Sequence, residues 1–365
     1  MDRRETERLL EAIHQARAAG RPAAMATIVR VKGSAYRREG TRMFVRQDGT
    51  YECALSGGCL EPAVAEAAMH VIETGQPALV SYDLADDSLW GLGIGCMGAV
   101  DIRIERLEDE AVTNTWLQIL ENGEAAVLVT PLAGPSGRMI VRESGATVGA
   151  LSDQAIAQKA AARAGLRLRE PNPESGTEWI DAAELFFEVA APPPHLVVFG
   201  AGPDAEPLVQ LAWSLGVAVT IVDPREAFLT PDRFPHATRL CAQPGEFADR
   251  VKVGAGDFVL VMNHHVERDQ ESFRLSLESD ASYIGVLGPR ARYETLLARL
   301  AAQGYIPDPE KLSRVHSPVG LSLGSETPQE VAVSILGEIL AIRRRFEGGF
   351  LTGSPRSLHR PDDTR

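Results

Sequence analysis

The sequence predicts an α/β protein, with an N-terminal mixed α/β domain followed by a doubly wound parallel sheet. Three consecutive prolines at 192–194 cannot continue a helix or a central strand, so they mark a boundary. After residue 195, short apolar runs alternate with helical patterns, which is typical of a parallel sheet. We therefore expect domains at 1–190 and 195–346 with a linker at 191–194, and a disordered tail at 347–365 because it lacks an apolar pattern.

The N-terminal domain contains both strand and helix patterns. Its N-terminus has the charged, amphipathic pattern of a helix. Apolar periodicity then predicts strands over Ala23–Val31, Thr41–Arg46, Val100–Glu105 and Ala125–Thr130, and helices over Leu60–Glu73, Asn114–Glu121 and Asp153–Ala164. Glycine and proline make Pro131–Gly149 a turn-rich stretch, and Arg169–Thr177 reads as a polar loop.

The C-terminal domain begins with a strand, a glycine turn, a helix and a second strand. The run His195–Phe199 is short and apolar, and Gly200–Ala205 fits the G-x-G-x-x-G/A pattern. In that pattern Gly200 permits the tight turn, and Gly202 lets a pyrophosphate approach the backbone near a helix start. Asp223 lies 23 residues after Gly200, where an acid binds a ribose hydroxyl. These features predict a Rossmann dinucleotide-binding unit.

Three residues modify this prediction. Pro203 removes one amide donor from the turn. Asp204 places a negative charge where a phosphate should lie, so the ligand either brings a cation or binds further from the turn; Asp204 stays a candidate cofactor contact. Arg225 could accommodate a 2′-phosphate, although we favour a surface charge.

Later residues of this domain add candidates to the same rim. The predicted strands are Asp257–Asn263 and Tyr283–Leu287, and the helices are Arg268–Glu278, Tyr293–Gln303 and Pro328–Phe346, the last one started by Thr327. His264 follows a strand at its carboxyl end, where open α/β sheets bind ligands, and a structural role is an equal alternative. Gly288 and Arg290 follow the next strand, and Arg290 could reach a phosphate.

Composition excludes several classes of function. The 37 basic and 50 acidic side chains give a net charge of −13, which argues against nucleic-acid binding. No run of 18 apolar residues and no signal region occurs, so we expect no membrane association and a cytoplasmic location. The long amphipathic C-terminal helix is a reasonable surface for a homodimer.

The four cysteines form no C-x-x-C pair, so neither a disulfide framework nor a four-cysteine zinc site is indicated. Cys59 follows Gly57 and Gly58 at a helix start, where the helix dipole favours a thiolate. Cys96 lies in a second glycine loop with Gly93 and Gly95, which can present amides to an anion. We favour functional thiols over small buried residues at both positions. Cys59, Cys96 and nearby Glu61 are the candidate catalytic residues, whereas Cys53 and Cys241 are assigned to packing.

Arginines follow a glycine-serine turn near the first strand. The guanidinium groups of Arg37 and Arg42 could clamp a phosphate. The alternative is that they pair with local acids, and the residues alone leave both open.

Six ordered motifs together resemble the XdhC/CoxI family. They are SGGCLE at 56–61, GIGCMG at 93–98, GAGPDA at 200–205, NHH at 263–265, YIGVLGPR at 283–290 and PVGLSLGSETPQEVAVSILGEIL at 318–340. The family comprises accessory proteins of molybdenum hydroxylases such as xanthine dehydrogenase and carbon monoxide dehydrogenase. Met97 stands where the family often has glycine, and Asn263 replaces a commoner threonine.

The resemblance implies a cofactor chaperone rather than an enzyme with turnover of its own. It implies that the protein binds the molybdenum cofactor, as molybdopterin or its dinucleotide form, and promotes exchange of an oxo for a sulfido ligand with a cysteine desulfurase. It also implies insertion of the cofactor into the apo-enzyme, with Cys59 and Cys96 contacting the molybdenum. The Rossmann domain would hold a nucleotide. The alternative is an NAD(P)-dependent oxidoreductase for a small carbonyl or hydroxy compound, with His264 or His265 as proton donor.

Overall fold

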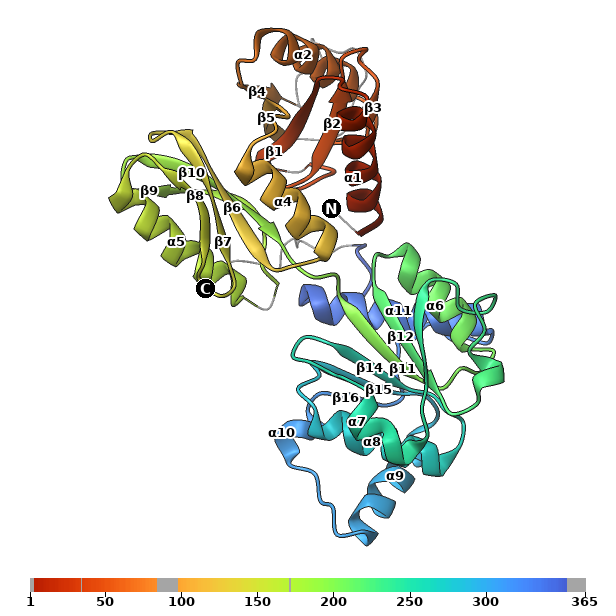
Figure 1. Ribbon diagram of the computed structural model, residues 1–365. Coiled ribbons are helices and arrows are strands. Elements are labelled where there is room, and N and C mark those ends of the chain that lie inside the picture. Colours follow the sequence, from red (N-terminus) through yellow and green to blue (C-terminus); the bar gives the residue numbers. More distant parts are fainter. Residues whose placement is uncertain (1–2, 34, 84–97, 171, 353–365) are drawn as a thin grey trace. The chain divides into compact units, whose positions relative to one another are not determined.

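The computed structural model describes residues 3–33, 35–83, 98–170 and 172–352 (Figure 1). The chain divides into two compact units, residues 1–192 and 193–365, called here the N-terminal and C-terminal units. The division falls within the predicted linker at 191–194. Three predicted site residues, Cys96, Gly93 and Gly95, lie outside the described residues, as does the predicted tail from 353 onward.

Sheet A is the first of two antiparallel sheets in the N-terminal unit. Its strand order is β3-β2-β1-β5-β4. The elements are α1 (Arg3–Ala18), β1 (Ala23–Gly33), β2 (Arg42–Arg46), β3 (Tyr51–Glu52), α2 (Glu61–Thr74), β4 (Ala78–Asp83) and β5 (Gly98–Arg106). The short strands β3 and β4 are absent from the sequence prediction.

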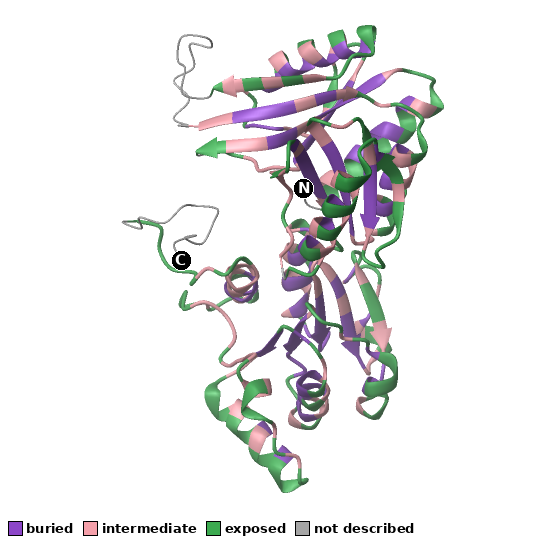
Figure 2. Ribbon diagram, turned by 90° about the vertical axis from the view of Figure 1, so that its left-hand side faces the viewer, coloured by how far each residue is buried: buried purple, intermediate pink, exposed green. Residues whose placement is uncertain are grey.

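Helices cover both faces of sheet A, and β1 shows how. Ala24, Ala26 and Ile28 point to one face and join the core with α2. Ala23 and Met25 point to the other face and pack with α1. Because neighbouring residues of a strand face opposite sides, burial of both faces explains the continuous run of buried apolar residues at 23–26. The far end of β1, which contains Arg30 and Lys32, is more exposed, and Figure 2 shows that buried residues are concentrated in the strands.

Sheet B follows, with the antiparallel order β8-β7-β6-β10-β9. Its elements are α4 (Ala111–Asn122), β6 (Ala126–Ala133), β7 (Gly137–Arg142), β8 (Thr147–Leu151), α5 (Gln154–Leu168), β9 (Gly176–Ile180) and β10 (Ala183–Ala190). Helix α5 packs on one face, and α4 packs on the other.

The prediction of turns over Pro131–Gly149 is wrong, because this stretch contains the end of β6, all of β7 and the start of β8. The prediction was wrong because Gly137 and Gly149, which lie in β7 and β8, were interpreted as turn residues. A Cβ on Gly137 would lie 2.2 Å from the Ala150 carbonyl oxygen, and a Cβ on Gly149 would lie 2.4 Å from that of Arg138. These glycines therefore permit close pairing of strands rather than turns. Strand β10 and most of β9 are likewise absent from the prediction.

The C-terminal unit contains a six-stranded parallel sheet, sheet C, in the order β13-β12-β11-β14-β15-β16. Numbered within the unit, this order is 3-2-1-4-5-6, which is the Rossmann order. The strands are β11 (His195–Phe199), β12 (Ala218–Asp223), β13 (Ala237–Cys241), β14 (Phe258–Val261), β15 (Tyr283–Val286) and β16 (Val315–His316).

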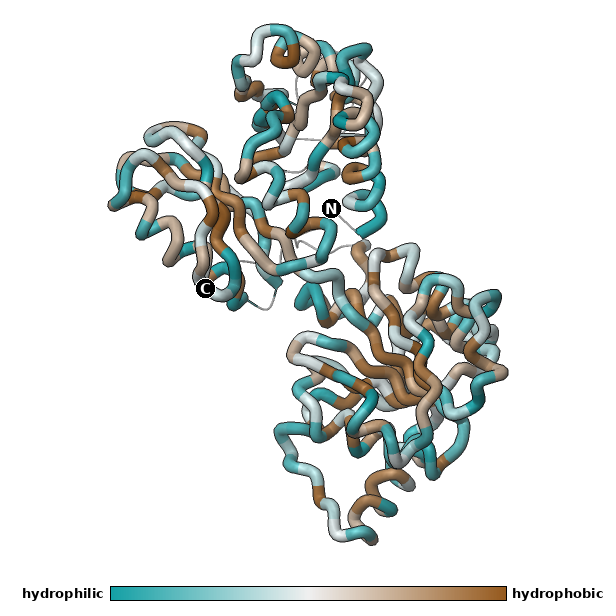
Figure 3. Tube along the Cα trace, viewed as in Figure 1, coloured by the Kyte–Doolittle hydropathy of each residue, from teal (hydrophilic) through white to brown (hydrophobic). Residues whose placement is uncertain are grey.

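Helices cover both faces of sheet C, and the strands between them are apolar (Figure 3). The helices are α6 (Ala205–Ser214), α7 (Phe247–Arg250), α8 (Val266–Glu278), α9 (Arg290–Ala302), α10 (Pro309–Leu312) and α11 (Pro328–Arg344). Helices α6 and α11 share one core, and α8 and α9 share the other. As predicted, Thr327 caps α11, here in a capping box with Glu330. None of the described helices is both long and apolar enough to span a membrane.

Candidate functional site

Residues 55–60, called here the thiol loop, connect sheet A to α2. Ser56 organises this loop: its Oγ accepts hydrogen bonds from the backbone N–H groups of Gly58 (3.2 Å), Cys59 (3.2 Å) and Leu60 (3.1 Å). The Ser56 hydroxyl in turn donates to Glu61 Oε2 at 2.6 Å. The amides that precede α2 therefore converge on one side chain.

Glu61 anchors the other end of the thiol loop. Its side chain is fully buried, and its Oε1 accepts hydrogen bonds from the amides of Leu55 (2.9 Å) and Ser56 (2.7 Å). Burial by itself would raise the pKa of Glu61, but the hydrogen bonds from Ser56 and the loop amides outweigh it and lower the pKa. Glu61, predicted as catalytic, is thus an ionised carboxylate that holds the loop.

The outer side of the thiol loop is open. Gly57 and Gly58 are exposed, and a Cβ on either would meet no described atom within 4 Å. Gly58 also has a φ of 111°, which side chains rarely adopt. The half-buried Cys59 places its Sγ 3.4 Å from Ser56 Oγ. The loop thus combines a soft sulfur with glycine backbone that a bulky ligand can approach.

The two arginines of the predicted phosphate clamp are held in ion pairs with acids. Arg37 pairs with Glu5 of α1, and Arg42 pairs with Glu188 of β10. Arg42 is also buried and lies 5.6 Å from the ring centroid of Trp116. The structure therefore presents the ion-paired alternative, and phosphate contact would require these pairs to open.

Residues 200–205, called here the phosphate turn, connect β11 to α6. Gly200 has a φ of 113°, and a Cβ there would lie 2.5 Å from the Met262 carbonyl oxygen of the neighbouring chain segment. The amide of Gly200 donates to the Val222 carbonyl at 2.8 Å. Gly200 is therefore required by the packing of the sheet as well as by the turn.

The imidazole of His264 lies over the phosphate turn. A Cβ on Gly202 would be 3.7 Å from His264 Cδ2, and His264 Nε2 lies 3.3 Å from Asp204 Oδ2. His264 has a φ of 56°, which is uncommon for a residue with a side chain. Three predicted contacts, Gly202, Asp204 and His264, are thus brought together at the carboxyl edge of sheet C.

Asp223 ends β12 beside the phosphate turn and is almost fully buried. It accepts hydrogen bonds from the amide of Ala201 (2.8 Å) and from the amide (2.9 Å) and guanidinium (2.9 and 2.8 Å) of Arg225. Burial would raise the pKa of Asp223, and these hydrogen bonds outweigh it and lower the pKa. The predicted ribose acid is therefore ionised and bonded within the chain.

Gly288 and Arg290 lie at the start of α9, after β15. Gly288 has a φ of 115°, and a Cβ there would be 2.9 Å from Arg292 Cδ. Arg290 is exposed and pairs with Glu294 one helical turn away at 3.1 Å. Arg292, which the sequence prediction does not include, is held by Asp269. Arg290 is therefore the more accessible of the two cations.

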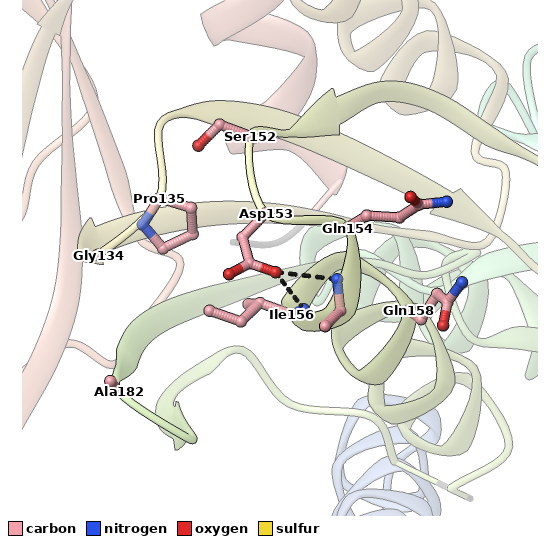
Figure 4. A pocket seen from close by; sticks show the side chains of 9 residues that line it. Gly134, Pro135, Ser152, Asp153, Gln154, Ile156, Gln158 and Ala182 are labelled. Atoms are coloured by element: carbon pink, nitrogen blue, oxygen red, sulfur yellow. Dashed lines mark hydrogen bonds between the residues drawn. The ribbon is translucent and has the colours of Figure 1, made fainter.

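A pocket of about 870 Å³ lies in the N-terminal unit, and none of its lining residues is a predicted site residue. It lies at the start of α5 and is lined by Gly134, Ser152, Asp153, Gln158 and Ala182, among others (Figure 4). Asp153 accepts hydrogen bonds from the amides of Ala155 (2.9 Å) and Ile156 (3.1 Å), and no arginine or lysine lines the pocket. Its lining therefore lacks the guanidinium and ammonium donors that bind phosphate most strongly.

Sequence reasoning missed three residues that shape these sites. Ser56 gathers the thiol-loop amides, Glu188 holds Arg42, and Arg233 donates to the Ala201 carbonyl at 3.0 Å. A serine shortly before a helix is a recognisable cap signal, but the other two act across long sequence separations. Within the described ranges, no group of three or more His, Cys, Asp or Glu side chains could hold a metal ion.

Comparisons with known proteins give consistent matches. Residues 16–83 match a model of the XdhC and CoxI family, and residues 196–339 match a model of the XdhC Rossmann domain. A probable xanthine dehydrogenase subunit of Bacillus subtilis (strain 168) is 33% identical over 328 residues, which are 88% of this chain and 94% of that protein. The molybdenum cofactor insertion chaperone PaoD of Escherichia coli (strain K12) is 22% identical over 330 residues, 90% of this chain and 86% of that protein. The crystal structure of a xanthine dehydrogenase from Bacillus halodurans superposes with a TM-score of 0.76 at 29% identity, covering 95% of this chain and 98% of that one.

Proposed function

Since the chain belongs to the XdhC and CoxI family, we propose that it binds the molybdenum cofactor and helps to insert it into an enzyme of the xanthine dehydrogenase type. The names of two relatives, a molybdenum cofactor insertion chaperone and a probable xanthine dehydrogenase subunit, support this proposal. The cofactor is cargo here, and the client apo-enzyme is the partner. The family resemblance adds a second type of client to this proposal, an enzyme of the carbon monoxide dehydrogenase type.

The thiol loop is the observation that carries the proposal. Molybdenum bound by a dithiolene is a soft centre, and thiolate sulfur is a soft ligand. Cys59 offers such a sulfur beside two exposed glycines that leave space for a bulky pterin. The residues present therefore fit the metal end of the cofactor, and Cys96 is proposed as a second thiol.

Four residues of the thiol loop, together with Glu61, have roles in the proposal. Cys59 contacts the molybdenum or the sulfur that is transferred, and Gly57 and Gly58 admit the ligand. Ser56 and Glu61 act as positioning residues, because they fix the backbone that carries Cys59. We further propose that a sulfido ligand replaces an oxo ligand of the cargo cofactor. The sulfur comes from the persulfide of a cysteine desulfurase, a thiol reductant supplies the two electrons that bring it to the sulfide level, and the oxo group leaves as water.

The test is purification of the full chain without oxygen from cells that synthesise the cofactor. Molybdenum is measured by mass spectrometry and pterin by the fluorescence of its oxidised form. We expect both in the parent, and a loss of about tenfold in Cys59→Ser and in Cys96→Ser, as expected when a metal contact is removed. Cys241→Ala is the matched control, because its Sγ lies 3.6 Å from the Pro224 carbonyl oxygen in the other unit and has no proposed contact with cargo.

Two results would contradict the proposal. If the parent retained no more molybdenum and pterin than an unrelated protein purified in parallel, the cargo assignment would fail. If the Cys59→Ser and Cys96→Ser forms retained as much as Cys241→Ala, the cofactor could still be cargo, but the thiol assignment would fail.

A further inference from the structure

The ribose side of the phosphate turn is built around a carboxylate whose acceptor sites are already used. Each oxygen of Asp223 accepts two hydrogen bonds: Oδ1 from the amide and Nε of Arg225, and Oδ2 from the Ala201 amide and Arg225 Nη2. A carboxylate has about four lone-pair sites. A ribose with two free hydroxyls needs some of those sites, so it can bind Asp223 only if Arg225 leaves.

Arg225 is held firmly where the ribose would lie. Its guanidinium stacks on the Phe228 ring, 3.8 Å from the ring centroid. Phe228 is fixed in turn, because Arg233 donates to the Phe228 carbonyl at 2.8 Å and to the Ala201 carbonyl at 3.0 Å. Displacing Arg225 would therefore break a bidentate ion pair and a stacking contact together.

The same geometry leaves the outer edge of Arg225 available. Its side chain is 39% exposed, and its Nη1 donates to no partner among the described residues. A guanidinium edge with free N–H groups matches the oxygens of a phosphate. Asp223 balances the charge of Arg225, and Glu206 balances that of Arg233. We therefore expect a phosphate to be held by directional hydrogen bonds rather than by a large net electrostatic attraction.

We propose that the phosphate turn binds a nucleotide that carries a phosphate on its ribose 2′-oxygen, of the NADP class, and that Arg225 determines this preference. The inference goes beyond the proposed function and does not depend on it, because it uses only the Rossmann order of sheet C and the contacts of Asp223 and Arg225. It makes this nucleotide a ligand separate from the molybdenum cofactor. It also reverses the expectation from the sequence that Arg225 is a surface charge.

Titration calorimetry of the full chain with NADP⁺ and NAD⁺ tests the preference directly. We expect NADP⁺ to bind about tenfold more tightly, as for a phosphate held by one guanidinium edge. Adenosine 2′,5′-bisphosphate should likewise bind more tightly than its 3′,5′ isomer, which separates the 2′ position from general anion binding. Tighter binding of NAD⁺, or no measurable binding of either dinucleotide, would overturn the inference.

Variants of Arg225 sharpen the test, because a ratio of affinities measured in one protein does not depend on how much of it is active. Arg225→Ala should lower the affinity for NADP⁺ about tenfold and leave that for NAD⁺ equal or higher, since the two acceptor sites of Asp223 that the guanidinium occupies become available. Arg225→Lys should give an intermediate ratio. Arg274→Ala on α8 is the matched control, being 44% exposed and paired within its own helix. An unchanged ratio in Arg225→Ala would refute the role of this residue.

Failure of this inference and failure of the proposed function give different results. A chain that carries molybdenum and pterin but discriminates no 2′-phosphate contradicts only the inference. A chain that prefers NADP⁺ but carries no cofactor from cells contradicts only the proposed function.

Discussion

The thiol loop and the phosphate turn are both glycine-rich segments that enter a helix, but their glycines serve opposite purposes. In the thiol loop, a Cβ on Gly57 or Gly58 would meet no atom of the described residues within 4 Å. In the phosphate turn, Gly200 is pressed against the backbone of the chain segment that follows β14. One segment is shaped by its own side chains, Ser56 and Glu61, whereas the other is shaped by the sheet around it. Glycines before a helix are therefore present for two different physical reasons in the two segments.

A buried carboxylate supports each segment, and this similarity sharpens the contrast. Glu61 holds the amides of its own loop, within six residues. Asp223 holds the amide of Ala201 from the neighbouring strand. A substitution that disrupts the thiol loop should therefore destabilise only that loop. A substitution that disrupts the phosphate turn should also destabilise sheet C.

The largest expected effect is that of Gly200→Ala. The new Cβ would lie 2.5 Å from a backbone oxygen, and alanine would have to adopt the φ of 113° that side chains rarely take, so β11 and β14 would have to separate. We expect the free energy of unfolding to fall by about 3 kcal/mol. Urea denaturation measures this, and hydrogen exchange should place the loss in sheet C. Gly245→Ala, whose Cβ would meet none of the described atoms within 4 Å, is the control, and equal stability of the two variants would contradict this packing role.

Glu61→Gln should have the next largest effect. Gln keeps one acceptor oxygen, but its amide group cannot accept from the Ser56 hydroxyl, so we expect a loss of about 2 kcal/mol at neutral pH. The pKa of Glu61 is lowered in the folded state, so its stabilisation is present above the unfolded-state pKa of about 4.3 and is lost as the pH falls through the folded pKa. The difference between parent and variant should therefore shrink in acid.

Urea denaturation at several pH values checks the Glu61 prediction. Glu73→Gln, an exposed position on the same helix, serves as control and should change little at any pH. A difference between parent and Glu61→Gln that grew on acidification would show that Glu61 does not act as an ionised anchor.

A smaller effect is expected for Gly58→Ala. The position has open space, so only its φ of 111° disfavours a side chain, and we expect a loss of about 1 kcal/mol. Urea denaturation is again the measurement, with Gly57→Ala as the neighbouring control. A loss as large as that of Gly200→Ala would mean that the thiol loop is packed rather than open.

The smallest effect on stability is expected for Gly57→Ala, within about 0.5 kcal/mol of the parent. If the proposed cargo lies against this glycine, the added methyl group should cost about 1 kcal/mol of binding, or about fivefold in affinity. The ratio of bound molybdenum to protein measures this loss. Unchanged stability with unchanged cofactor content would place the cargo elsewhere on the chain.

Much of the C-terminal unit could be predicted from the sequence because its signals are local. Short apolar runs, the G-x-G turn and the acid after the second strand predicted the Rossmann unit, which the structure and the family match confirm. The six motifs predicted the family correctly. In the N-terminal unit, strands β7 and β8 were not predicted because Gly137 and Gly149 were interpreted as turn residues. Each of these glycines is required by the close backbone of the partner strand, which the local sequence does not indicate.

By itself, the sequence determined the α/β class, the Rossmann turn and the position of a cysteine after two glycines, since each depends on residues close together in the chain. Only the tertiary structure decided which side chains remain available to a ligand. Arg42 lies 146 residues from the Glu188 that occupies it, and Asp223 lies 22 residues from the Ala201 amide that it holds. For these two pairs the partner is brought by folding from a distant part of the chain, and no local pattern records it.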